Sequence, residues 1–200
     1  MKLLLNNTSP YARMVRIVML EKGLENSIEL CWCDPWSDDK FLIEKNPAGK
    51  IPALVCDSGI TLSESLLIAT YLDGQGSSRS LLPEGQKETI YHLAGLGIGL
   101  IDAAFLTVIS RKYLNAETDD SVLSQRRLSA IERTVECLNK DIDNHSSPEW
   151  LSLGDITVVV ALNYLLFRLP ELNVAQKHPK LEAWRKNIDQ RSSFQSTPFL

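Results

Sequence analysis

The sequence has few residues that could hold a metal ion or carry dithiol chemistry. It contains only three histidines and four cysteines in 200 residues. The histidines lie far apart, with no carboxylate or cysteine at ligand spacing. Cys31-Trp32-Cys33 has neither the spacing of a zinc finger nor that of a C-x-x-C redox pair. We therefore expect reduced thiols and no metal.

Excess positive charge and long apolar runs are also missing. The net charge of −4 gives no general basic surface for nucleic acid. The longest uninterrupted apolar run, residues 158–162, is far shorter than the ~20 residues that span a bilayer. Residues 1–5 are followed at once by two asparagines, too early for the apolar region of a signal peptide. The sequence thus predicts a cytoplasmic protein that binds neither nucleic acid nor membrane.

The N-terminal part of the chain alternates between short strands and helices. Pro10 and Gly23 bracket a helix, Asp57-Ser58-Gly59 is a tight hairpin turn, and Ser63 is placed to cap the helix that follows. The expected strands cover residues 2–5, 27–32, 53–56 and 60–62, and the expected helices cover residues 10–22, 38–44 and 64–72. This β-α-β-α-β-β-α order predicts an α/β domain of thioredoxin-like fold in residues 1–76.

The remainder of the chain has only helical periodicity. Residues 74–78 are polar and rich in glycine, which is typical of a linker, and they precede a predicted all-helical domain in residues 84–200. Its expected helices cover residues 88–113, 120–144, 153–169 and 179–190. Ser152 and Asp155 have the spacing of a capping box at the start of the third.

Three glycines lie within the first long helix of this second domain. Gly95, Gly97 and Gly99 each cost up to ~1 kcal/mol relative to alanine in a helix interior, so we expect them to allow another backbone to approach closely. That backbone belongs either to a neighbouring helix of the same domain or to a second copy of the chain. A homodimer packed through this helix is therefore predicted.

Two neighbouring stretches have the features of a peptide-binding site. Ile51 precedes Pro52, which keeps residue 51 extended, so its backbone can pair with a ligand. Glu64 and Ser65 open a helix, and a helix start offers free N–H groups and a partial positive charge to a carboxylate. The Glu64 carboxylate could hold an amine. These features would suit the binding of a small zwitterionic peptide. The same residues are also consistent with an ordinary hairpin followed by a capped helix that has no binding role.

A third stretch, residues 8–12, follows the first strand at the position where thioredoxin-like proteins carry their reactive group. Compared with the Cys-Pro-Tyr-Cys of a glutaredoxin, Ser9 and Ala12 replace the cysteines, which excludes dithiol chemistry. A serine here can still donate a hydrogen bond to a ligand sulfur and, with the helix dipole, favour the thiolate. Ser9 or Thr8 could equally cap the helix at Pro10, and the two roles can coexist.

These stretches together resemble the glutathione S-transferase family. Residues 46–54, followed by Glu64-Ser65, are similar to its glutathione site, and the Ser152 to Asp155 box is similar to the capping box of its C-terminal domain. The two motifs lie in separate domains in the correct order, and the resemblance covers essentially the whole chain.

The resemblance implies roles for these residues. Pro52 is expected to be cis, with the backbone of Ile51 pairing with the cysteine of glutathione. Glu64 and Ser65 are expected to bind the γ-glutamyl end. The sulfur would be activated by Ser9, although some relatives place that residue at the position of Thr8.

The remaining candidates are implied less directly. Lys50 could reach the glycine carboxylate of glutathione, and Asp102 matches the place from which some relatives send an acidic residue across a dimer to the glutathione amine. A hydrophobic cosubstrate would lie between Ser9 and the helical domain. Its candidate lining residues are Tyr11, Phe105 and Tyr113, although aromatic residues at helical spacing also serve as core.

The function implied by the resemblance is that of a transferase that conjugates glutathione to small electrophiles, as in detoxification. The alternative is a non-catalytic regulator or protein-binding module on the same fold, like the starvation-response proteins. Glu64 and Ser65 argue against the alternative, because a site released from ligand binding need not keep an acidic residue beside a helix start. Ser9 argues against a thiol reductase or peroxidase.

Overall fold

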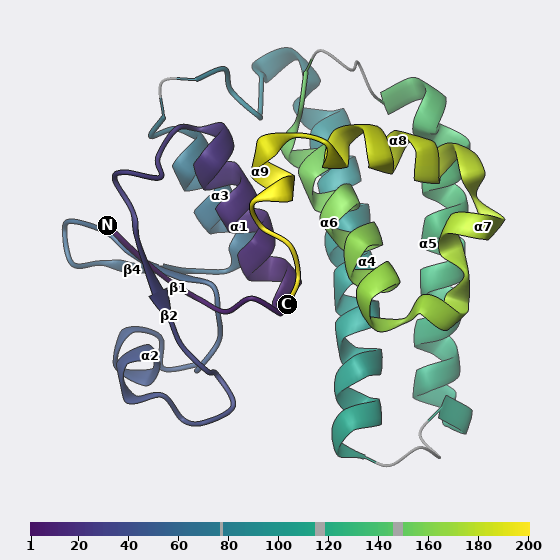
Figure 1. Ribbon diagram of the computed structural model, residues 1–200, viewed down its shortest axis with the longest axis horizontal. Coiled ribbons are helices and arrows are strands. Elements are labelled where there is room, and N and C mark those ends of the chain that lie inside the picture. The colour runs from purple at the N-terminus through teal and green to yellow at the C-terminus, as the bar shows by residue number, and fades with distance from the viewer. Residues whose placement is uncertain (77, 115–118, 146–149) are drawn as a thin grey trace. The chain divides into compact units, whose positions relative to one another are not determined.

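Residues 1–76, 78–114, 119–145 and 150–200 are described by the computed structural model, in which the chain divides into two units. Unit 1 comprises Met1–Glu84 and Ser192–Leu200, and unit 2 comprises Gly85–Arg191. Figure 1 shows the elements of both. The last segment thus belongs with unit 1, whereas the sequence places it in the helical domain.

Unit 1 contains a four-stranded sheet in the order β2-β1-β3-β4, with β1 and β2 parallel and the other pairs antiparallel. Its strands are β1 (Lys2–Leu5), β2 (Glu29–Trp32), β3 (Ala53–Val55) and β4 (Thr61–Ser63), and its helices are α1 (Pro10–Glu21), α2 (Lys40–Lys45), α3 (Ser65–Asp73) and α9 (Ser192–Gln195). The predicted order of elements and the thioredoxin-like fold are confirmed.

The central strand β1 is buried on both faces. Leu4 packs with Leu42 of α2 and with Ala53 of β3. Successive side chains of a strand point to opposite faces, so Leu3 and Leu5 face the other side of the sheet. There α1 and α3 lie side by side (Figure 1). A continuous leucine run is what such a doubly covered strand requires.

The segment Ser192–Leu200 is held on α1, which explains its place in unit 1. Phe194 is almost completely buried, and its carbonyl accepts a hydrogen bond from the Arg13 guanidinium at 3.4 Å. The Arg13 guanidinium also lies 4.6 Å from the centre of the Phe199 ring. At the other end of α1, the Ser193 hydroxyl donates to the Glu21 carboxylate. Helical periodicity does not predict such long-range contacts.

The glycine-rich stretch that the sequence indicates as a linker is anchored by a buried ion pair. The Lys22 ammonium lies 3.0 Å from the Asp73 carboxylate and donates to the carbonyls of Ser78 and Arg79 at 2.9 and 3.1 Å. Asp73 also accepts hydrogen bonds from the backbone N–H of Leu81 and the hydroxyl of the preceding serine. The ends of α1 and α3 and the chain that leaves α3 are therefore joined at one point.

Unit 2 is helical, and its main helices agree with the predicted ranges. They are α4 (Lys87–Tyr113), α5 (Val122–His145), α6 (Leu153–Arg168), α7 (Val174–Lys177) and α8 (Pro179–Asp189), with 3₁₀ turns η1 (Glu84–Gln86), which begins in unit 1, and η3 (Pro170–Leu172). The Ser152 hydroxyl accepts from the Asp155 N–H at 3.1 Å, and the Asp155 carboxylate accepts from the Ser152 N–H at 2.8 Å. This capping box starts α6, whose residues 153–162 are all buried.

The glycines of α4 have different surroundings. A Cβ atom at Gly97 would lie 2.7 Å from the Thr157 Cγ2 and 2.9 Å from the Val158 nitrogen, so this glycine permits α4 and α6 to pack closely. Gly95 and Gly99 have nothing within 4 Å of that position. The close approach predicted from the sequence is therefore confirmed within unit 2 at Gly97.

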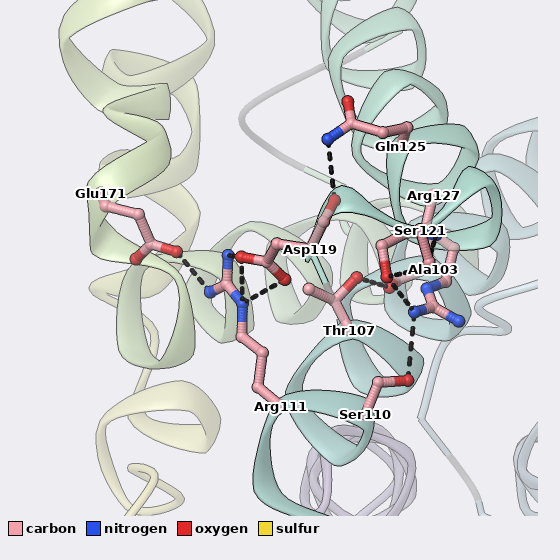
Figure 2. Close-up of polar contacts among 10 residues, drawn as sticks. Ala103, Thr107, Ser110, Arg111, Asp119, Ser121, Gln125, Arg127 and Glu171 are labelled. Atoms are coloured by element: carbon pink, nitrogen blue, oxygen red, sulfur yellow. Dashed lines mark hydrogen bonds and ion pairs between the residues drawn. The ribbon is translucent and has the colours of Figure 1, made fainter. Parts of the chain in front are cut away.

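An arginine network fixes the far end of α4. Figure 2 shows the Arg111 guanidinium between the carboxylates of Asp119 and Glu171, at 2.8 and 2.6 Å. Hydrogen bonds to these two carboxylates raise the pKa of Arg111. Nearby, Arg127 donates to the hydroxyl of Ser110 (Figure 2). It also donates to the hydroxyl of Ser124. The contacts join α4 to α5 and to η3.

The helix Glu84–Tyr113 is long and apolar enough to cross a membrane by length and composition alone. Its apolar residues are interrupted by glycines and a few polar residues, so no long uninterrupted apolar run marks this helix in the sequence. Of its most apolar window, 44% is buried, and the helix packs against α5 and α6. Core helices of soluble proteins meet the same criterion.

Candidate functional site

Strand register brings three separate stretches of unit 1 to one edge of the sheet. Leu4 of β1 pairs with Ala53 of β3, and Ala53 pairs with Ser63 of β4. The chain leaving β1 toward Ser9, the chain entering β3 through Pro52 and the chain leaving β4 through Glu64 therefore lie beside one another. These are the three stretches that the sequence singles out.

The first of these stretches to consider is the turn before β3. The Ile51–Pro52 peptide bond is cis, as the family resemblance implies. The buried Asn46 amide donates to the Lys50 carbonyl at 2.7 Å and so holds the turn. In the part of the chain that the structure describes, the Ile51 backbone makes no hydrogen bond, so it remains open to a ligand.

The start of α3 differs from the prediction. Ser63 is not the N-cap: it is the last residue of β4, and pairing with Ala53 holds it in the sheet. Glu64 occupies the cap position and makes no side-chain capping bond. Its φ of 69° and ψ of 117° are rare for a residue with a side chain, and strained backbone of this kind is concentrated at functional sites.

The uncapped helix start leaves donors for an anion. The first helical hydrogen bond runs from the Ile68 N–H to the Glu64 carbonyl, so the N–H groups of the preceding turn have no partner within the helix. The Glu64 side chain is exposed and Ser65 is buried. A carboxylate could accept from these N–H groups while the Glu64 carboxylate attracts an amine.

The loop before α1 holds two hydroxyls in different states. The Ser9 hydroxyl oxygen accepts from the Ala12 N–H at 3.2 Å, which makes Ser9 the N-cap. Its hydroxyl hydrogen donates to no other residue in the described ranges. The Thr8 hydroxyl instead donates to the Asn6 side chain at 3.4 Å. Ser9 is therefore the hydroxyl with a hydrogen to offer a ligand.

Two asparagines hold the turns at this edge of the sheet through side-chain hydrogen bonds. They are not among the candidate site residues predicted from the sequence. Asn6 accepts from the backbone N–H groups of Thr8 and Ser9 at 3.2 and 2.9 Å. Asn46 holds the turn before Ile51 in a similar way. An asparagine two or three residues before a turn is a known local signal, because its short amide side chain can bond to nearby backbone.

The thiols of Cys31 and Cys33 are poor nucleophiles. Burial, the charge of Asp39 and other nearby acidic groups raise the pKa of Cys33 to about 11, despite a contact with the Leu5 carbonyl. Burial and Glu29 also raise the pKa of Cys31. At neutral pH both thiols stay protonated. Within the described residues, no three His, Cys, Asp or Glu side chains gather as a group that could hold a metal.

The other candidate residues are distributed over both units. Lys50 is exposed and Tyr11 is half-buried in unit 1. Asp102, Phe105 and Tyr113 lie on α4 of unit 2. Phe105 and Tyr113 are separated by about 12 Å along the axis, from a rise of 1.5 Å per residue, so α4 does not bring them together.

Unit 1 thus combines a thioredoxin-like fold with an open helix start, an extended backbone before a cis-proline and a serine at the start of α1. Comparison with known protein families gives a match over this part of the chain. Residues 8–75 match the family described as "Glutathione S-transferase, N-terminal domain".

Similarity extends over the full length. A glutathione transferase family member from Pseudomonas fluorescens Pf-5 with bound glutathione is 32% identical, with a TM-score of 0.89 and coverage of 98% of each chain. A second structure of that description, with bound S-(propanoic acid)-glutathione, is 31% identical, with a TM-score of 0.86 over 100% of each chain. The GST-like protein YibF of Escherichia coli K12 is 29% identical over 98% of each. The chain belongs to the glutathione S-transferase family.

Proposed function

We propose that the chain binds glutathione in unit 1 and conjugates it, through its thiolate sulfur, to a small electrophile. The observation that carries this proposal is the meeting of Ser9, Ile51-Pro52 and Glu64-Ser65 at one edge of the sheet. The relative from Pseudomonas fluorescens, which is similar over the whole chain, binds glutathione.

Each part of glutathione has a matching group in this proposal. The Ile51 backbone pairs with the cysteine of glutathione. Ser65 and the first N–H groups of α3 donate hydrogen bonds to the γ-glutamyl carboxylate, and Glu64 holds the γ-glutamyl amine. Lys50 attracts the glycine carboxylate.

Ser9 supplies the chemical activation. Its hydroxyl donates to the glutathione sulfur, and the start of α1 adds a positive potential, so both favour the thiolate. The thiolate attacks the electrophilic carbon and forms a carbon–sulfur bond. A leaving group departs with its electron pair, or an activated alkene takes up a proton from solvent at the neighbouring carbon. Within unit 1, Tyr11, next to Pro10 at the start of α1, is the proposed contact for apolar electrophiles.

The bound conjugate of the relative indicates a class of electrophile. S-(propanoic acid)-glutathione carries a carboxylate at the end of its sulfur substituent. We propose that electrophiles bearing a carboxylate are among the substrates of this chain.

Isothermal titration with glutathione tests the proposed function most directly. A transferase is expected to bind glutathione and S-methylglutathione, because the peptide portion supplies most contacts. A regulator on the same fold would bind neither. Absence of binding at millimolar glutathione would contradict the proposal.

Glu64→Gln is expected to weaken glutathione binding by roughly tenfold or more, because it removes one charge-assisted contact worth about 1.5–3 kcal/mol. Glutamine keeps the shape of the side chain and the same strained backbone position. Glu25→Gln, at an exposed position after α1, is the matched control and should leave the dissociation constant unchanged. Equal affinity in the wild type and Glu64→Gln would remove Glu64 from the site.

A homodimer packed through α4 is proposed as the functional form. Gly95, Gly99, Asp102 and Leu106 are exposed along one face of this helix, and two-fold dimers are the commonest oligomers. Asp102 would reach across the dimer to the amine of the glutathione bound by the other copy of the chain. Sedimentation should report about twice 22.4 kDa.

Leu106→Glu is expected to dissociate this dimer, because it adds a charge to an apolar contact. Leu123→Glu makes the same change at an exposed position of α5 and should leave the mass unchanged. A monomer at micromolar concentration in the wild type would rule out both the dimer and the role of Asp102.

A further inference from the structure

Arg16 is a half-buried cation without a carboxylate partner among the described residues. Its guanidinium carbon lies 5.1 Å from the centre of the Trp32 ring. Its Nε is fully buried and has no hydrogen-bond acceptor in the described part of the chain. Arg111 and Arg185, by contrast, pair with carboxylates at 2.8 and 2.7 Å.

Burial makes this charge costly. Desolvation lowers the pKa of Arg16, yet a guanidinium stays protonated in proteins. An anion that joined it would meet a partly desolvated cation, where a charge-assisted hydrogen bond is stronger than at the surface. The planar guanidinium fork fits a carboxylate with two parallel hydrogen bonds.

Two independent features of the backbone bring this pair to the side of unit 1 where Ser9 lies. Arg16 follows Ser9 by seven residues, which returns a helix to nearly the same face, about 10.5 Å farther along the axis. Side chains of a helix lean toward its N-terminus, so the Arg16 side chain covers part of this separation. Trp32 is the last residue of β2 and pairs with Leu5, the last residue of β1, from which the chain runs to Ser9.

We propose that Arg16, stacked on Trp32, binds the carboxylate of the electrophile and so selects carboxylate-bearing substrates. This inference rests on the proposed function, because it needs the sulfur of glutathione to lie at Ser9. Trp32 is 51% exposed, and its ring offers an apolar face to the short alkyl segment between sulfur and carboxylate. Arg16 is thus a specificity-determining residue.

The test compares two conjugates of equal shape by isothermal titration. S-(2-carboxyethyl)glutathione carries the carboxylate, and S-(2-carbamoylethyl)glutathione carries a neutral amide in its place. The wild type is expected to bind the carboxylate conjugate on the order of tenfold more tightly. Arg16→Gln should abolish the preference, Arg16→Lys should restore part of it, and Arg133→Gln, at an exposed position of α5, should leave it intact.

S-methylglutathione separates the possible failures. Its dissociation constant should be the same in the wild type and in Arg16→Gln, which also shows that the variant is folded. Equal affinity of the wild type for the two conjugates, with normal binding of S-methylglutathione, would overturn the role of Arg16 and leave the proposed function standing. Failure of all three ligands to bind the wild type would overturn both.

Discussion

Asp73→Asn is expected to reduce the free energy of unfolding by about 3–5 kcal/mol, because it leaves the buried Lys22 ammonium without its counter-charge. The two side chains are 8% and 1% exposed, and they join the ends of α1 and α3 to the chain that follows. Exposed pairs contribute far less. Unfolding of the wild type and of Asp73→Asn in guanidinium chloride measures the difference in the free energy of unfolding.

The same pair makes stability depend on pH. Burial alone would raise the pKa of Asp73, but hydrogen bonds from the Leu81 N–H, the Ser80 hydroxyl and the Lys22 ammonium outweigh it and hold the pKa below its usual value. The unfolded chain therefore takes up a proton at higher pH than the folded protein does. The contribution of Asp73 is present above the ordinary pKa of 3.8 and is lost as the pH falls through the lower, folded value.

Two further variants make the stability prediction specific. Glu29→Gln breaks the exposed Lys2–Glu29 pair and should leave the unfolding midpoint nearly unchanged. Lys22→Met combined with Asp73→Asn should lose less than the sum of the single losses, since neither charge is then left buried alone. A midpoint for Asp73→Asn equal to that of Glu29→Gln would show that the pair does not stabilise the fold.

Local signals in the sequence predict most elements and single out the three stretches that meet at one edge of the sheet. Pro10, Gly23 and the Ser152 to Asp155 box mark helix ends through contacts within four residues. The prediction of a cis bond at Pro52 rests on the family resemblance, because about nineteen in twenty X–Pro bonds in folded proteins are trans.

Features that depend on distant residues could not be predicted in the same way. Ser63 has the composition of an N-cap, but its pairing with Ala53 in the sheet overrides that preference. Lys22 meets Asp73 across a separation of fifty-one residues (73 − 22), and Phe194 returns to α1 from near the far end of the chain. Only the folded register and packing bring such groups together.

Ser9→Ala is expected to raise the pKa of the bound glutathione thiol by about one unit or more and to slow conjugation at neutral pH roughly tenfold or more. A hydrogen bond to a charged sulfur is worth roughly 1.5–3 kcal/mol, whereas the helix dipole supplies about 1 kcal/mol or less at a partly exposed site. The hydroxyl and the start of α1 therefore share the stabilisation of the thiolate. Titration of the thiolate absorbance with pH measures the shift.

Affinity for glutathione should change little in Ser9→Ala, because the contacts to the peptide portion do not involve the hydroxyl. Thr8→Val is the matched control: the Thr8 hydroxyl already donates to Asn6, so its removal should leave the thiolate titration unmoved. If Thr8→Val alone abolished thiolate formation, the activating hydroxyl would be that of Thr8. If neither variant moved the titration, the start of α1 or a bound water would have to stabilise the thiolate without either side chain.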